Sequence, residues 1–432
     1  MASLLMIAVA AGLGAIVLTA MLRATTSILL ALAVPEGPGR TGGDLGPAVS
    51  TGWIHMEHPW LLPIVVAAGM GGAAALSLLE TAQSVAGTDG LIAALDRRDL
   101  TGLHVRGAAI KVGGTALTLG GGGSGGTEGP MAQVAASLAA SVVRKLRLSP
   151  EESRMWVITG LAAGVGALFQ APWGGAVLGA ELLRRRGVEW RLLARTIPAA
   201  HIAHWVYMAV YGPGPFLGHV PIALVPQLSD SFAIAAVGVC CGLIARLYIG
   251  ATLVVHTRLT ASRQQRPLLT ATLAGAAIGF AGICIPTTLG TGYSTIEAAL
   301  STSAVLAVPL WTLAVLPVVK TAATALTLGS GGVGGYFGPA MVIGAAVGAL
   351  GWRLTVQFGM HPGPVAAFIM AGVAACLGPA VGCPLAAIVM CTEATGNSFP
   401  HTGMLLAVGI SALVLGNRTL FPSQNASPRH AR

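Results

Sequence analysis

The chain has 432 residues, of which 54% are hydrophobic and only 9% are charged, and its formal net charge is +9. Soluble domains carry about 25% charged residues, so this composition excludes a soluble enzyme and predicts a polytopic all-α membrane protein. The excess of basic residues is better explained by loops on the cytoplasmic side of a lipid bilayer than by binding to nucleic acid.

Apolar segments follow one another along the chain, and we expect them to form membrane helices. The first, within residues 1–34, lacks a basic start and is too long for a signal peptide, so we expect a retained helix. Several segments are shorter than the ~20 residues that span a bilayer, and many are interrupted by Gly and Pro, which is typical of transporters. The segments are roughly 3–22, 61–79, 107–119, 131–143, 155–181, 192–211, 231–255, 268–285, 303–328, 339–358, 364–391 and 402–416.

The sequence contains an internal repeat. The stretch Lys111–Pro130, KVGGTALTLGGGGSGGTEGP, recurs as Lys320–Pro339, KTAATALTLGSGGVGGYFGP, at an offset of 209 residues. Without a gap, 13 of the 20 paired positions are identical. A second block, Gly160–Glu181, recurs as Gly372–Glu393 at an offset of 212 residues.

Two blocks that recur in the same order indicate duplication of a whole half, and we place the halves at 1–227 and 228–432. An odd number of crossings per half would invert one copy relative to the other. The expected fold is therefore an all-α membrane protein with an inverted repeat of broken and tilted helices. In such a fold, the two glycine-rich turns approach one point from opposite sides.

Each repeat carries the pattern of a helix start. A glycine run leads into x-x-G-P, and Pro is favoured in the first turn of a helix because the N–H that it lacks has no partner there. We therefore expect helix starts at Thr127-Glu128-Gly129 and at Tyr336-Phe337-Gly338. A helix start offers free backbone N–H groups and about half a positive charge. Two starts that face each other predict an anion-binding site without a fixed cation.

Glu128 is the one acid among these glycines. An ionisable group at membrane depth is costly, so it is a functional candidate. A carboxylate here competes with an anion for the same N–H donors: ionised, it blocks the path, and protonated or displaced, it opens it. The hypothesis is that Glu128 is a gate; the alternative is an acid that merely complements the helix dipole.

At these residues the chain resembles the CLC family of chloride channels and proton-coupled chloride transporters. Gly126–Pro130 looks like the family's G-[K/R]-E-G-P element, whose Glu is the gate. Gly335–Pro339 looks like its G-x-F-x-P element, whose backbone amides hold chloride, and Phe169–Glu181 resembles the helix that carries the internal proton acceptor of the exchangers.

The resemblance implies a homodimer in the inner (plasma) membrane, with one pore per subunit between inverted halves. It implies chloride or a similar anion as substrate and no cofactor. From the short polar tail, Pro422–Arg432, we expect no soluble regulatory domain.

Three departures from the family concern the anion path. The family's G-S-G-I-P element is replaced by Val85–Gly90, VAGTDG, which resembles the G-T-D variant of some prokaryotic members, with Gly87 and Thr88 at the anion. The basic residue before the gate is Thr127, which weakens the positive field outside the site. The pore-lining Tyr falls at Phe421, which has no hydroxyl for an anion.

A fourth departure concerns protons. The proton-accepting Glu of the exchangers matches Leu182, which cannot carry a proton. We therefore predict passive conduction or uncoupled transport. The alternative is a proton-coupled chloride or fluoride antiporter in which the neighbouring Glu181 relays protons.

Three other features have simpler interpretations. The stretch His55–His58, HMEH, lacks a third strong ligand, and we expect no metal site. Lys111 and Lys320 hold equivalent repeat positions, where they either attract anions at a vestibule or extend to the membrane interface. Glu393 repeats Glu181 and is interpreted as a structural partner at a helix end.

Overall fold

The computed structural model describes residues 1–33, 58–80, 87–183, 187–222 and 228–426. These residues form helices and connecting turns, and no strand occurs within the described ranges. The α-helices are α1 (Ala2–Leu29), α3 (Leu62–Ser77), α4 (Gly87–Asp96), α5 (Val105–Gly120), α6 (Glu128–Lys145), α7 (Pro150–Leu168), α8 (Pro172–Glu181), α9 (Trp190–Tyr211), α10 (Leu228–Gln265), α11 (Pro267–Cys284), α12 (Tyr293–Ala299), α13 (Thr302–Ala307), α14 (Leu310–Gly329), α15 (Phe337–Gln357), α16 (Val365–Val381), α17 (Pro384–Ala394), α18 (Thr402–Leu415) and α19 (Ser423–Ala426). Short 3₁₀ turns are η1 (Leu30–Leu32), η2 (Pro59–Leu61) and η3 (Pro286–Thr288).

Six described helices are long and apolar enough to cross a membrane: α1, η2 with α3, α10, α11, α14 and α15. Others are apolar but shorter, such as α17 with 11 residues. The first expected apolar segment forms a helix, α1. The expectation of short and broken membrane helices is confirmed.

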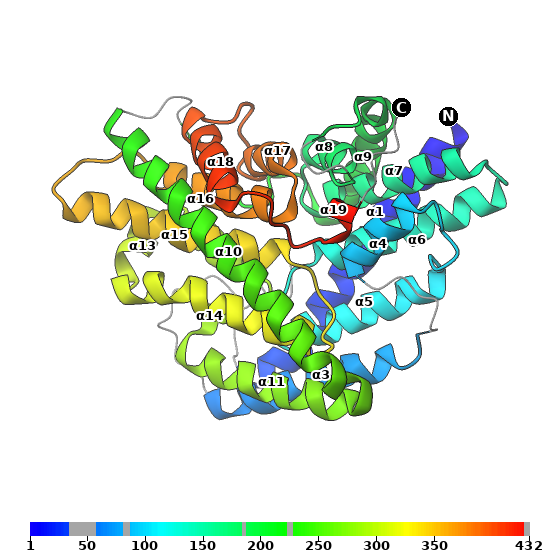
Figure 1. The fold of residues 1–432 in the computed structure, drawn as a ribbon, viewed down its shortest axis with the longest axis horizontal. Helices are drawn as coiled ribbons and strands as arrows, with labels where there is room; N and C mark the ends of the chain where they lie inside the picture. The colour runs from blue at the N-terminus through cyan, green and yellow to red at the C-terminus, as the bar shows by residue number, and fades with distance from the viewer. Residues whose placement is uncertain (34–57, 81–86, 184–186, 223–227, 427–432) are drawn as a thin grey trace.

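The repeats occupy corresponding places in the fold. Helices α5 to α8 of the first repeat match α14 to α17 of the second, in the same order. Figure 1 shows the two sets on opposite sides of the molecule, with the long α10 running diagonally across the near face. The short helices α8 and α17 lie side by side, and α3 packs against α11 at the other end.

The same break interrupts each repeat. Between α16 and α17 the chain turns at Gly382, whose φ is +73°, and Pro384 begins the next helix. At the equivalent place, Gln170 adopts φ +50° and Pro172 begins α8. Glycine tolerates this left-handed conformation, whereas other residues seldom adopt it. The repeat therefore preserves the backbone of the break although one copy lacks the glycine.

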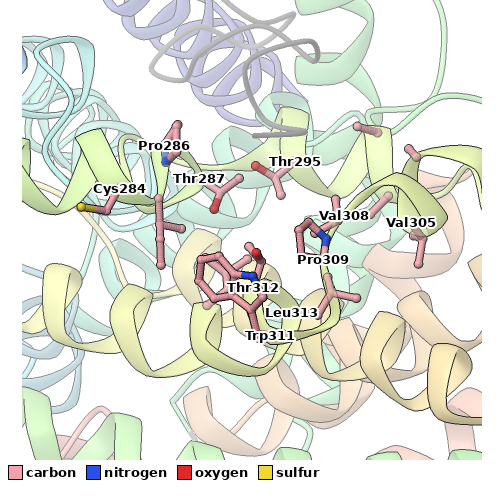
Figure 2. Close-up of a pocket in the computed structure, with 15 residues that line it drawn as sticks. Cys284, Pro286, Thr287, Thr295, Val305, Val308, Pro309, Trp311, Thr312 and Leu313 are labelled. Carbon is pink, nitrogen blue, oxygen red and sulfur yellow. The ribbon is translucent and has the colours of Figure 1, made fainter. Parts of the chain in front are cut away.

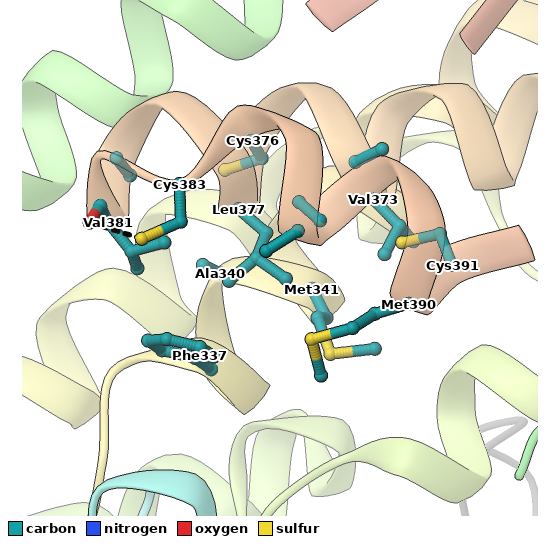
Figure 3. Close-up of a cluster of buried hydrophobic side chains, with 14 of the residues drawn as sticks. Phe337, Ala340, Met341, Val373, Cys376, Leu377, Val381, Cys383, Met390 and Cys391 are labelled. Carbon is teal, nitrogen blue, oxygen red and sulfur yellow. Dashed lines mark hydrogen bonds between the residues drawn. The ribbon is translucent and has the colours of Figure 1, made fainter. Parts of the chain in front are cut away.

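The buried apolar side chains form several clusters, and one of them includes the place where α15, α16 and α17 meet. Every residue of α16 is buried. Figure 3 shows Phe337 and Met341 of α15 on the side of this helix, with Met390 of α17 beside Met341. Small residues and sulfur-containing side chains fill this space, and they allow the helices to pack closely. This packing fixes the first turn of α15, which belongs to the candidate site.

Candidate functional site

The two glycine-rich turns meet inside the molecule. The N–H of Gly126 donates to the carbonyl of Gly335 at 2.8 Å, and the N–H of Gly335 donates to the carbonyl of Gly126 at 2.6 Å. Next to this pair, the N–H of Ser124 donates to Thr327 Oγ1, and the N–H of Val333 donates to Thr118 Oγ1, both at 3.0 Å. Gly126 and Gly335 are equivalent in the repeat, and the Ser124–Thr327 and Val333–Thr118 contacts are equivalent to each other. The starts of α6 and α15 are thus brought together, as the sequence predicts.

Glycine is required at this meeting point. A Cβ on Gly126 would overlap Oε2 of Glu128 and lie 2.7 Å from the backbone nitrogen of Gly338. A Cβ on Gly335 would lie 2.8 Å from the backbone nitrogen of Gly129. No side chain fits at these distances, so the glycines leave space for the group that occupies the centre.

That group is the carboxylate of Glu128. Glu128 is the first residue of α6 and its side chain is 1% exposed. The space that a Cβ on Gly126 would fill adjoins both Oε2 of Glu128 and the backbone nitrogen of Gly338, so the carboxylate lies beside the start of α15. Its Oε1 accepts a hydrogen bond from the hydroxyl of Tyr293, whereas Oε2 is buried without a hydrogen-bond partner. The carboxylate thus lies between the two helix starts, where an anion would be stabilised by the same dipoles.

Tyr293 was missed in the sequence. It is the first residue of α12, 2% exposed, and lies between two of the expected apolar segments. The sequence feature that could have indicated Tyr293 is its place directly after Gly290-Thr291-Gly292, in a chain with only five tyrosines.

The remaining candidates from the first half lie at the start of α4. Thr88 is buried, and its Oγ1 lies 2.8 Å from the position that a Cβ on Gly129 would take. Gly87 begins α4 with φ +65°, while Val85 and Ala86 lie outside the described residues. The structure therefore places the Thr88 hydroxyl against the start of α6.

Phe421 also reaches the site. Its side chain is fully buried, with ring centroids 6.4 Å from Phe337 and 6.2 Å from Tyr336. Asp89 of α4 accepts a hydrogen bond from the N–H of Ser423 at 2.9 Å and so ties the last segment to α4. The Tyr248 hydroxyl on α10 donates to the carbonyl of Tyr336 at 3.1 Å, which holds the start of α15.

A cavity of about 10 Å³ adjoins the carboxylate, which is close to the space needed for one water molecule. Apart from Glu128, its lining carries no ionisable group, and Thr88 is the only other polar side chain in it. Leu182 is part of this lining, so the position that matches the exchangers' proton acceptor presents an apolar surface here. The lining is Thr88, Glu128, Gly129, Ala132, Leu161, Val165, Leu178, Leu182 and Phe337.

A larger cavity of about 660 Å³ shares Thr88 and Gly129 with the small one. Its wall is polar and charged, as expected for an aqueous vestibule. The ionisable groups on it are Glu80, Asp89, Lys111, His256, Arg263 and Tyr336. Thr88 and Gly129 therefore lie between this vestibule and the Glu128 carboxylate.

The two repeat-related lysines differ. Lys111 lines the large cavity, which agrees with the interpretation that it lies in a vestibule. Its ammonium pairs with Glu80 at 3.2 Å. Lys320 is fully buried, and its Nζ donates to the carbonyls of Thr288 (3.1 Å), Leu289 (3.3 Å) and Gly290 (2.9 Å). Neither the vestibule nor the interface interpretation is right for Lys320, because its ammonium is enclosed by backbone carbonyls.

Glu181 and Glu393 cap each other's helices. Glu181, the last residue of α8, accepts from the N–H of Leu385 (3.3 Å) and of Ala386 (2.8 Å) in the first turn of α17. Glu393 of α17 accepts from the N–H of Trp173 (3.2 Å) and of Gly174 (2.7 Å) in the first turn of α8. The prediction of a helix-end partner is confirmed for Glu393, and Glu181 is engaged in the same way.

The remaining features lie apart from this site. Among the described residues, no group of three or more His, Cys, Asp or Glu side chains could hold a metal ion; His55 and Glu57 lie outside them. A cavity of about 270 Å³ between α12, α13 and α14 is lined mainly by apolar groups such as Trp311 and Leu313 (Figure 2). It offers no charge to an ion.

Comparison with known proteins agrees with this architecture. A family described as "Voltage gated chloride channel" matches residues 70–416. A putative chloride channel protein, ClcB-like, from Ralstonia nicotianae is 30% identical over 334 residues, which cover 74% of each chain. The voltage-gated ClC-type chloride channel ClcB of Escherichia coli is 29% identical over 296 residues, or 68% of this chain and 69% of the relative.

Two solved structures share the fold. A CLC-type fluoride/proton antiporter has a TM-score of 0.77 and 20% identity, covering 98% of this chain and 96% of its own. A slow cyanobacterial Cl⁻/H⁺ antiporter has a TM-score of 0.76 and 19% identity, covering 100% and 99%. The chain therefore belongs to the voltage-gated chloride channel (CLC) family, and as a member it is an anion-transporting membrane protein that uses no cofactor, not an enzyme.

Proposed function

We propose that the chain lets chloride, or a similar small anion, cross the membrane passively or without coupling to protons, and that Glu128 is the gate. In this proposal the anion passes between the starts of α6 and α15. The backbone N–H groups at residues 127–129 and 336–338 bind it, and Gly87, Thr88 and Phe421 line its inner side.

The position of the Glu128 carboxylate is the observation that supports this proposal most directly. It occupies the space between two helix starts, beside the N–H of Gly338. A negative group is stabilised there by partial charges alone, without a Lys or Arg that would hold an anion too tightly to release it. The carboxylate and the anion compete for one place, so movement of the carboxylate opens the path.

The absence of coupling is inferred from the surroundings of the gate. The small cavity beside Glu128 is lined by Leu182 and other apolar side chains, which cannot pass a proton onward. Glu181, the nearest alternative in the sequence, has both carboxylate oxygens engaged by the first turn of α17.

The second candidate function is a proton-coupled chloride or fluoride antiporter. It is favoured by the two structural neighbours, which are described as fluoride/proton and Cl⁻/H⁺ antiporters. In this case Glu181 would leave its contacts with α17 to carry protons. The two functions differ in whether anion flux moves protons against their gradient.

We further propose that the protein is a homodimer in the inner (plasma) membrane. Each subunit would then hold one pore between the halves 1–227 and 228–432. Single-molecule photobleaching of labelled protein in liposomes tests the dimer, because one-step bleaching alone would contradict it.

The deciding experiment uses purified protein in liposomes with opposed chloride and proton gradients. Passive conduction predicts a reversal potential that follows the chloride gradient alone and does not shift when the pH gradient is changed. A reversal potential that moves with the pH gradient at a stable stoichiometry would establish the antiporter. The absence of any anion flux, in wild type and in Glu128→Ala, would contradict both.

A further inference from the structure

We propose that Tyr293 is a latch on the gate: its hydroxyl holds the Glu128 carboxylate between the helix starts, and it sets how readily an anion displaces that carboxylate. This inference rests on the proposed gating role of Glu128. Tyr293 acts through Glu128 and is therefore a positioning residue.

The first observation is the hydrogen bond itself. The Tyr293 hydroxyl donates to Oε1 of Glu128, and among the described residues no other side chain donates to this carboxylate. The small cavity beside Glu128 offers Thr88 as its one other polar side chain. An O–H that donates to a carboxylate forms one of the stronger hydrogen bonds in proteins.

The second observation is that the tyrosine ring is held in place. Its centroid lies 5.9 Å from that of Phe169 at 79° and 5.0 Å from that of Phe216 at 75°. Both arrangements are edge-to-face, which aromatic rings prefer, and both partner rings are buried. The ring therefore cannot turn away without losing two aromatic contacts, and its hydroxyl stays directed at the gate.

The third observation is that the segment before Tyr293 is tied to both repeats. Lys320 donates to the carbonyls of residues 288–290. On the other side, the N–H of Gly290 donates to the carbonyl of Gly122 at 3.1 Å, and the N–H of Gly125 donates to the carbonyl of Gly290 at 3.3 Å. Lys320 thus fixes the backbone segment that positions the Tyr293 hydroxyl.

These contacts predict a competition. An anion that binds between the helix starts must displace the carboxylate from beside the backbone nitrogen of Gly338 and also break its bond to Tyr293. A hydrogen bond to a charged group corresponds to about 10- to 100-fold in an equilibrium constant. Removing the hydroxyl should therefore make the carboxylate easier to displace.

The test is Tyr293→Phe, which keeps the ring and removes the hydroxyl. Chloride affinity is measured by calorimetry on the purified protein, and chloride efflux is measured from liposomes. We expect affinity to rise at least about fivefold, and efflux to rise with it. In the Glu128→Ala background, the same substitution should change affinity less than about twofold, because the latch has nothing left to hold.

Tyr207→Phe is the matched control. Tyr207 is also a buried tyrosine, and its hydroxyl lies 3.2 Å from Thr19 Oγ1, between α9 and α1. Its loss should leave chloride affinity unchanged. If Tyr293→Phe does not fold, Tyr293→Leu provides a second test with the same expected direction.

The outcomes separate the latch from the gate. Unchanged affinity in Tyr293→Phe, with a clear rise in Glu128→Ala, would overturn the latch and leave the gate in place. An effect of Tyr293→Phe that persists in the Glu128→Ala background would also overturn the latch, because Tyr293 would then act without the carboxylate. No effect of Glu128→Ala on binding or flux would remove the gate itself.

Discussion

Gly126 and Gly335 exchange both of their backbone hydrogen bonds, although they lie in different halves of the chain. Each turn therefore uses the other as its partner, and the two helix starts are held at one distance. A rigid pair of dipoles suits an anion site, because nothing has to reorganise when the ion arrives. The movable part of the site is then the Glu128 side chain, which is not fixed by the backbone pair.

Gly126→Ala should close the site. The new Cβ would overlap Oε2 of Glu128 and lie 2.7 Å from the nitrogen of Gly338, so the methyl group fills the place proposed for both carboxylate and anion. Forcing a methyl group into a packed site costs about 1–3 kcal/mol, and we expect anion affinity and efflux to fall about 5- to 150-fold. Gly409→Ala is the control, because a Cβ there meets nothing within 4 Å. Efflux at the wild-type level in Gly126→Ala would contradict the assignment of this space to the anion.

Glu128→Gln and Glu128→Ala should have the opposite effect. Neutralising or removing the carboxylate frees the space between the helix starts, so we expect faster chloride efflux that no longer depends on pH. Efflux from liposomes between pH 4.5 and pH 8 measures both changes. Unaltered rates with the wild-type pH profile would leave Glu128 as an acid that only complements the dipole of α6.

Much of this site could be predicted because its two helix starts lie within the internal repeat. The identities at an offset of 209 residues placed Thr127-Glu128-Gly129 opposite Tyr336-Phe337-Gly338, and the structure brings them together. The second block likewise gave Glu181 and Glu393 as equivalent positions, but only the fold shows that each caps the other's helix. Symmetry was a guide for the two helix starts because the two copies contact each other directly there.

The roles of the other residues depend on contacts that the repeat does not predict. Lys111 and Lys320 are equivalent in the sequence, yet one faces a vestibule and the other faces the carbonyls of η3 and the turn after it. Tyr293 follows a loop between two apolar segments, and no local pattern indicates that its hydroxyl reaches Glu128. Such roles arise from packing between distant segments and need the fold.

Lys320→Met and Lys111→Met should separate the two lysines. Lys320 is fully buried and donates to three carbonyls, so its loss leaves them without their donor and should cost about 3 kcal/mol or more of stability. Lys111 borders the large cavity and makes one ion pair, with Glu80 at 3.2 Å, so its loss should cost less, about 1–2 kcal/mol. It should also slow anion entry at low ionic strength, because it leaves the negative charge of Glu80 unpaired on the cavity wall. Thermal unfolding in detergent and efflux at two salt concentrations measure these effects. Equal destabilisation by both variants would contradict the different structural roles assigned to Lys320 and Lys111.

Glu181→Gln and Glu393→Gln should behave alike. Each carboxylate accepts two N–H groups at the start of the partner helix, so each amide substitution weakens one charge-assisted cap and should lower stability by about 1–3 kcal/mol. Because the two caps are equivalent in the repeat, neither substitution should change the dependence of the reversal potential on a pH gradient. The measurements are thermal unfolding and reversal potentials on both variants. If Glu181→Gln alone altered that dependence, Glu181 would be a proton relay rather than a cap, and the antiporter would become the better account of this chain.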